Sequence, residues 1–229
     1  MRIDIISAVP DLLNSPLNYS IIKIAREKGL VDIKIHDLRD YTEDKHRRID
    51  DYPYGGGAGM VLTAQPIFTC IEVLQKERDY DEVIYTSPDA KVYDQQEANY
   101  LSLKTNIIIL CGHYKGIDER VRQSLVTREI SIGDYVLSGG ELPALVITDS
   151  IVRLQPGVLG DAESALEDSF QDGLLSGPLY TRPANFKDMK VPEVLQTGDH
   201  KKIVEWQKKQ SEGRTRQYRP DLYKKYIND

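Results

Sequence analysis

The chain has 229 residues, a formal net charge of −6 and a hydrophobic content of 40%, values typical of a globular protein. No apolar run approaches the length of a membrane span, and the N-terminal stretch lacks the apolar region of a signal peptide. We therefore expect a cytoplasmic protein without a membrane partner. Cys70 and Cys111 are far apart, and the four histidines show no metal-ligand spacing, which disfavours a disulfide or zinc framework.

The charges are unevenly distributed along the chain. Residues 181–229 carry 12 Lys and Arg against 7 Asp and Glu, whereas residues 1–180 carry 18 against 29. Residues 161–180 contain 5 acidic residues and no basic residue. This sorting disfavours a uniformly basic nucleic-acid binder and predicts that the C-terminal segment meets a polyanion.

Apolar runs and helical periodicity alternate through the first 154 residues. The segment 106–110 is apolar on both faces, as a central parallel strand should be. Strands separated by helices predict a parallel sheet with helices on both faces, interrupted by a polar loop at 39–60. Gly29 is placed to end its helix. The expected strands are 3–9, 31–36, 82–86, 106–110 and 128–132, and the expected helices are 17–28, 66–77, 94–103, 118–126 and 141–154.

Loops that carry glycine or proline follow three of the late strands, at 87–91, 111–116 and 131–143. Strand-to-helix connections also use these residues simply to turn the chain, which is the plain alternative for each loop. Three such loops together, with Tyr114 and Tyr135 available for stacking, favour a ligand pocket at the carboxyl ends of the strands. Because neither G-x-G-x-x-G nor a phosphate loop is present, a nucleoside without phosphates fits better than ATP.

Five motifs follow one another in a fixed order: PYGGGAGMVL (53–62), CGHYKGIDERV (111–121), EISIGDYVLSGGELPAL (129–145), RLQPGVLG (153–160) and EDSFQDGLLSGPLYTRP (167–183). From residue 1 to about Tyr223 the chain resembles the bacterial tRNA (guanine-N1)-methyltransferases of the SPOUT, or trefoil-knot, superfamily. That family transfers a methyl group from S-adenosylmethionine to N1 of guanine 37 of tRNA, next to the anticodon.

The resemblance implies an α/β fold with a parallel-sheet SPOUT domain at 1–160 that ends in a trefoil knot. An interdomain linker at 161–172 and a small all-α, tRNA-binding domain at 173–229 would follow. The family forms homodimers with the active site at the subunit interface, and the expected helix 141–154 agrees, because its apolar residues surround most of its circumference. A dependence on Mg²⁺ is implied by resemblance only, and its ligands stay unknown.

By the same resemblance, the three loops hold the cofactor. The residues expected to bind S-adenosylmethionine are Pro88, Gly112, Tyr114, Gly116, Ile132, Gly133, Asp134, Tyr135, Val136, Leu137, Gly139, Gly140 and Pro143.

The chemistry requires a base, since N1 of guanine carries a proton at neutral pH, and a partner for charge that develops on O6. Asp168 matches the family's general base, and Arg153 matches the arginine that stabilises the guanine. From the residues alone, Asp168 could be a solvated linker acid, and Arg153 could pair with Asp149 along a helix.

A basic helix is expected near the C-terminus, from His200 to Glu212, with Asp199 as its N-cap and Gly213 behind it. Ile203, Val204 and Trp206 suit its inner face. Its lysines and the arginines that follow could be only the solvated charges of a surface helix, but on an acidic protein they fit a phosphate-binding patch. The residues expected to bind RNA are Arg182, Lys201, Lys208, Arg214, Arg216 and Arg219.

Three positions depart from the family pattern. Lys115 stands where the family usually has glutamate, Ala90 replaces a glycine, and Ser176 replaces an acid. Two other classes stay open: a SPOUT enzyme that acts on another base or ribose, and a non-catalytic RNA-binding protein. A Rossmann dehydrogenase lacks support, because no glycine fingerprint follows the first strand.

Overall fold

The computed structural model describes residues 1–159 and 168–228, and the chain divides into two compact units, Met1–Gly160 and Asp161–Asp229. The first unit is built on a sheet, and the second is mainly helical. In the part of the chain that the structure describes, no helix combines the length and apolar character that crossing a bilayer requires.

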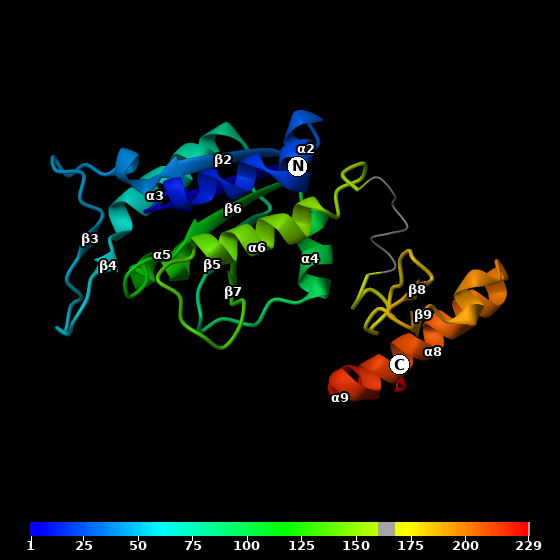
Figure 1. Cartoon of the computed structure of the whole chain (residues 1–229). Coiled ribbons are helices and arrows are strands. Elements are labelled where there is room, and N and C mark those ends of the chain that lie inside the picture. Colours follow the sequence, from blue (N-terminus) through cyan, green and yellow to red (C-terminus); the bar gives the residue numbers. More distant parts are fainter. Residues whose placement is uncertain (160–167, 229) are drawn as a thin grey trace. The chain divides into compact units, whose positions relative to one another are not determined.

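A five-stranded parallel sheet forms the centre of the first unit, with the strand order β2-β1-β6-β5-β7 (Figure 1). β6 is the middle strand, and its residues 107–111 are buried. The predicted central parallel strand is therefore confirmed. The strands are β1 (Arg2–Ser7), β2 (Asp32–Asp37), β5 (Glu82–Thr86), β6 (Asn106–Cys111) and β7 (Arg128–Ile130).

Helices cover both faces of this sheet, as predicted. One core contains Ile5, Ile109 and Ile147 and lies under α1, α2, α4 and α6. The other core contains Ile6 and Ile108 and lies under α3 and α5. Successive strand residues enter opposite cores because side chains alternate across a sheet. The helices are α1 (Asp11–Asn14), α2 (Ser20–Glu27), α3 (Ala64–Glu77), α4 (Gln95–Ser102), α5 (Glu119–Ser124) and α6 (Glu141–Val152).

Several element boundaries differ from the sequence prediction. The helix expected from residue 17 begins at Ser20, because Pro16–Asn18 forms a separate 3-10 helix. The expected polar loop at 39–60 begins inside a 3-10 helix, Leu38–Tyr41, and includes β3 (Asp50–Asp51), which pairs antiparallel with β4 (Val61–Leu62). Gly29 does follow α2 with φ 69°, the conformation of a helix-ending glycine.

The apolar residues that surround most of α6 are only partly buried within the single chain. Ala144, Ile147 and Ile151 are fully buried, but Leu142 is 49% exposed and Val146 is 47% exposed. The helix therefore presents one apolar side to the sheet and a second apolar side to the surface of its own unit.

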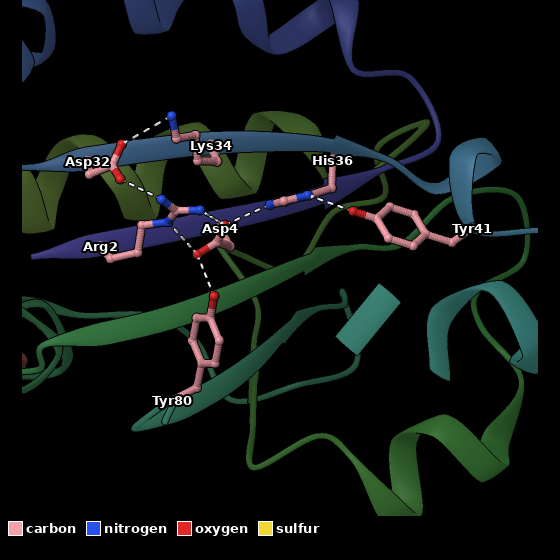
Figure 2. A network of polar contacts seen from close by, with 7 residues as sticks. All are labelled: Arg2, Asp4, Asp32, Lys34, His36, Tyr41 and Tyr80. Carbon is pink, nitrogen blue, oxygen red and sulfur yellow. Dashed lines mark hydrogen bonds and ion pairs between the residues drawn. The ribbon is translucent and has the colours of Figure 1, made fainter. Parts of the chain in front are cut away.

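A buried polar network ties β1 to β2 and to Tyr80, which lies two residues before β5. Figure 2 shows Arg2, His36 and Tyr80 converging on Asp4, which is fully buried. Two Arg2 nitrogens, His36 Nε2 and Tyr80 Oη each lie 2.7 Å from the Asp4 carboxylate. Burial alone would raise the pKa of Asp4, but the hydrogen bonds from His36, Arg2 and Tyr80 outweigh it and hold that pKa well below its ordinary value.

The second unit contains helices and one short hairpin. β8 (Asn185–Phe186) pairs antiparallel with β9 (Met189–Lys190) across a turn in which Lys187 and Asp188 both have positive φ. The expectation of an all-α unit omitted this hairpin. The helices are a 3-10 helix (Glu193–Gln196), α8 (His200–Tyr218) and α9 (Pro220–Tyr226).

The basic helix α8 begins where the sequence predicts, since the Asp199 side chain accepts a hydrogen bond from Lys202 N. The predicted end at Gly213 was wrong, because the helix continues to Tyr218. Thr215 is fully buried, and its hydroxyl donates to Ser211 O at 2.7 Å and accepts from Leu175 N at 2.8 Å, which holds the last turn in place. The inward placement of Val204 was also wrong, because its side chain is 59% exposed.

Candidate active site

Three strand-to-helix loops line a cavity of about 450 Å³ at the carboxyl ends of β5, β6 and β7. This is the position and size expected of a small-molecule site in a parallel α/β sheet. The cavity brings together twelve of the thirteen residues that the sequence predicts as cofactor-binding. They are Pro88, Gly112, Tyr114, Gly116, Ile132, Gly133, Tyr135, Val136, Leu137, Gly139, Gly140 and Pro143.

Asp134 is the exception, because it is exposed and does not line the cavity. The Tyr135 side chain folds back toward the loop, and its hydroxyl donates to Ile132 O at 3.4 Å. A Cβ on Gly133 would stand 2.6 Å from the Tyr135 ring. Tyr135 therefore packs against this turn at the rim of the cavity, whereas Asp134 does not contribute to the cavity wall.

Backbone hydrogen bonds join the three loops to one another. Gly140 N donates to Gly112 O at 2.7 Å, which links the third loop to the second. Ser131 N donates to Lys91 O at 2.9 Å, which links the third loop to the first. Tyr114 has φ 56°, a left-handed conformation that costs a non-glycine residue energy. The cavity wall is therefore a fixed framework of main-chain groups.

Close main-chain approach explains the glycine at residue 140. A Cβ on Gly140 would overlap Thr86 Oγ1 and would stand 2.7 Å from Gly112 N. The loops after β5, β6 and β7 can meet here only without a side chain.

One ion-pair cluster borders the cavity. Arg122, from α5, lies 3.0 Å from Asp89 and 2.5 Å from Glu129. The hydrogen bond from Ser87 and the pairing with Arg122 lower the pKa of Asp89. Because two carboxylates compensate one guanidinium, this cluster offers no surplus positive charge to a phosphate. At this corner of the cavity, a nucleoside therefore fits better than a nucleotide.

The two residues predicted to be catalytic belong to different units. Arg153 follows α6 in the first unit, is partly buried, and its backbone N donates to Asp149 O at 3.1 Å. Asp168 is the first described residue of the second unit and is partly buried there. Of the linker predicted at 161–172, residues 161–167 lie outside the described residues, and residues 168–172 are described.

The six cations predicted to bind RNA are all exposed and all belong to the second unit. Arg214 and Arg216 lie near the C-terminal end of α8, within 6.0 Å of the rings of Tyr218 and Tyr223 respectively. Arg219 differs from them because its guanidinium pairs with Asp221 at 2.7 Å. Its charge is therefore partly compensated. The others are Arg182, Lys201 and Lys208.

Comparison with known proteins places the whole chain in one family. The family described as tRNA (Guanine-1)-methyltransferase TrmD matches residues 1–225. The chain belongs to this tRNA (guanine-1)-methyltransferase family. It is 61% identical to a tRNA (guanine-N(1)-)-methyltransferase of Bacteroides fragilis over 97% of this chain and 99% of that relative. It is 58% identical to one of Cytophaga hutchinsonii over 99% of this chain and 96% of that relative.

Family membership confirms the resemblance drawn from the five motifs. The three departures from the family pattern lie at distinct places. Lys115 lines the cavity, Ala90 belongs to the loop after β5, and Ser176 lies in the second unit, where its backbone N donates to Ser169 Oγ at 2.9 Å.

Sequence reasoning missed several residues of the cavity wall. Tyr85 and Thr86 line it from the last residues of β5, and the position of strand ends in a parallel sheet could have indicated them. Arg122 reaches the cavity from a helix, and no local pattern marks it. His113 Nδ1 is buried without a hydrogen-bond partner among the described residues, next to Gly139.

Proposed function

We propose that this chain transfers a methyl group from S-adenosylmethionine to N1 of guanine 37 of tRNA, in the cytoplasm. The observation that carries the proposal is the glycine-walled cavity formed by three loops in a chain that matches this family over residues 1–225. Bound there, the donor supplies an electrophilic methyl group on a sulfonium.

The cavity residues fit a nucleoside donor on two counts. Gly112 and Gly140 line the cavity without side chains, so main-chain groups of the wall can approach the edge of an adenine. Tyr114 and Tyr135 are 46% and 54% exposed and supply aromatic faces at the rim. The backbone links between the loops support the proposal that this segment forms the family's trefoil knot.

The two proposed catalytic residues supply the two functions that methylation of guanine N1 requires. Asp168 accepts the N1 proton and so frees the lone pair for attack, and Arg153 stabilises negative charge on O6. A general base of this kind contributes about 10²–10⁴-fold to a rate. The alignment of N1 with the methyl carbon supplies a further part of the rate enhancement.

A homodimer with the active site at the subunit interface completes the proposal. The outer side of α6 carries Leu142 and Val146, which are both nearly half exposed within one chain. An apolar helix side next to the third cavity loop suits contact with a second copy. The exposed cations of the second unit would contact the tRNA backbone.

Mg²⁺ has no evident place in the described residues, where no group of three or more His, Cys, Asp and Glu could hold a metal ion. We derive no catalytic step through this ion.

The test is methyl transfer from S-adenosylmethionine to unmodified tRNA transcripts that carry either guanine or adenine at position 37. The proposal expects transfer to the guanine transcript and transfer near background to the adenine transcript. Equal transfer to both transcripts would contradict the assignment to guanine 37.

A further inference from the structure

Three described residues on the cavity wall carry a formal charge: Asp89, Lys115 and Arg122. Asp89 and Glu129 both pair with Arg122, at 3.0 Å and 2.5 Å, so the charges of that corner are compensated within the protein. Lys115 forms no ion pair with any residue in 1–159 or 168–228. Lys115 is therefore the cation of this wall that has no acidic partner in the described chain.

The main chain around Lys115 is held firmly. Lys115 N donates to Met60 O at 3.0 Å, and Leu62 N donates to Gly116 O at 3.0 Å. Gly116 N also donates to His113 O at 3.0 Å, which closes a turn. These hydrogen bonds join the loop after β6 to the strand β4, so the Cα of Lys115 has a defined position at the cavity.

The aliphatic part of the Lys115 side chain is also held in place by packing. It lies over Gly59, where an added Cβ would stand 2.9 Å from Lys115 Cγ and 3.0 Å from Lys115 Cε. Gly59 has φ 97°, which other residues rarely adopt, and it leaves the space that the stem occupies. Packing of the stem lowers the entropy that the ammonium group loses when it binds an anion.

We propose that Lys115 recognises the carboxylate of the methyl donor's amino-acid part. This inference rests on the proposed function, because it requires that the cavity hold S-adenosylmethionine. The donor has one anionic group, its α-carboxylate, and Lys115 supplies a positive charge that no acid within residues 1–159 or 168–228 neutralises. An ammonium–carboxylate hydrogen bond is among the stronger polar contacts, and its charge orients the donor with the carboxylate end at Lys115.

The geometry favours this partner over a phosphate of the tRNA. Tyr114 and Gly116, the neighbours of Lys115, line the same cavity, so the lysine belongs to the wall. A glutamate, which the family usually has here, would repel a carboxylate at the same place. The cavity of this chain therefore differs from the usual family pattern in how it binds the amino-acid part of the donor.

Calorimetric titration of the purified full chain, without tRNA, tests the inference with two ligands. S-adenosylhomocysteine carries the carboxylate, and 5′-methylthioadenosine lacks the whole amino-acid part. Lys115→Met should weaken the binding of S-adenosylhomocysteine about tenfold. It should change the affinity for 5′-methylthioadenosine by less than about twofold. Lys115→Arg should keep affinity within about threefold of the unmodified chain. Raising the salt concentration should weaken the binding of S-adenosylhomocysteine more in the unmodified chain than in Lys115→Met.

Lys76→Met is the matched control, because Lys76 is exposed on α3 and does not line the cavity. It should change neither affinity. Lys115→Gln serves as a second neutral variant if Lys115→Met does not fold. Equal weakening of both ligands would overturn the inference, because Lys115 would then only shape the cavity. Unchanged affinity for S-adenosylhomocysteine would also overturn it, and a separate measurement that shows weakened tRNA binding by the same variant would then assign Lys115 to a phosphate. Failure of the unmodified chain to bind S-adenosylhomocysteine would instead contradict the proposed function.

Discussion

Gly140 and Thr86 meet at a distance that leaves no room for a side chain between them. Thr86 Oγ1 lies 3.4 Å from Gly140 O, and a Cβ on Gly140 would overlap the hydroxyl oxygen. Thr86 ends β5, and Gly140 ends the loop that enters α6. This contact therefore sets how closely the third loop approaches the sheet, and with it the shape of the cavity.

Gly140→Ala should destabilise the fold and weaken ligand binding together. The added methyl group must displace Thr86 or the backbone of Gly112, and strain of this kind costs about 1–3 kcal/mol. Urea unfolding should show that loss, and calorimetry should show weaker S-adenosylhomocysteine binding. An unfolding curve and an affinity equal to those of the unmodified chain would show that the cavity does not depend on this contact.

Gly213→Ala is the matched control for that experiment. Gly213 lies inside α8, and a Cβ there would meet nothing within 4 Å. Because alanine is favoured over glycine in a helix, the substitution should stabilise the second unit by about 0.5–1 kcal/mol. The same chemical change therefore has opposite expected signs at residues 140 and 213.

The elements of the first unit could be predicted largely from hydrophobic patterns. β5 was predicted with its observed limits, and the doubly apolar segment that became β6 indicated the centre of the sheet. These patterns suffice because burial on both faces leaves a signal in consecutive residues. The cavity position followed from the rule that ligands bind at the carboxyl ends of parallel strands.

Features that depend on distant contacts could not be predicted. Gly213 resembled a helix end, but the buried hydrogen bond of Leu175 N to Thr215 Oγ1 keeps the helix running past it. The four hydrogen bonds on Asp4 come from Arg2, His36 and Tyr80, and local spacing joins only Arg2 to Asp4, two residues apart on β1. Tertiary contacts of this kind override local propensity.

Asp4 should make the stability of the fold depend on acidity. Its pKa lies below the unfolded value of about 3.9, so its contribution is complete above that pH and is lost as the pH falls toward the folded pKa. Asp4→Asn should cost about 3–5 kcal/mol near pH 7, because it leaves the buried Arg2 charge with only the exposed carboxylate of Asp32 as a partner.

Urea unfolding at pH 7 and at pH 2.5 measures that dependence. The difference between the unmodified chain and Asp4→Asn should shrink by about 1 kcal/mol or more at the lower pH. Asp32→Asn removes the other carboxylate partner of Arg2. The Asp32 side chain is 55% exposed, so this substitution should cost less than about 1 kcal/mol. A difference for Asp4→Asn that stays constant with pH would contradict the role assigned to its carboxylate (Figure 2).

Asp168→Asn should abolish most methyl transfer while it leaves binding intact. Removal of a general base lowers the rate about 10²–10⁴-fold, whereas the amide keeps the size of the side chain. Affinities for tRNA and S-adenosylhomocysteine should stay within about threefold. Asp172→Asn is the control, because an asparagine there keeps the oxygen that accepts from Leu174 N at 3.0 Å. A rate for Asp168→Asn equal to that of Asp172→Asn would exclude Asp168 as the base.

Arg216→Gln should weaken tRNA binding more than Arg219→Gln does. Arg216 forms no ion pair among residues 168–228, whereas Arg219 pairs with Asp221 at 2.7 Å and already has a compensating carboxylate. Binding measured at several salt concentrations should show the slope for Arg216→Gln reduced by about 0.7–0.9, the value for one phosphate contact. The reverse order of the two variants would show that the RNA contacts Arg219 instead.

The most direct measurement is identification of the methylated atom in the product. The full chain is incubated with methyl-labelled S-adenosylmethionine and an unmodified tRNA transcript, and nuclease fragments are then examined by mass spectrometry. The account predicts label in 1-methylguanosine, confined to the fragment that contains position 37. Label on another base or on a ribose, or no transfer by a chain that binds S-adenosylhomocysteine, would contradict it.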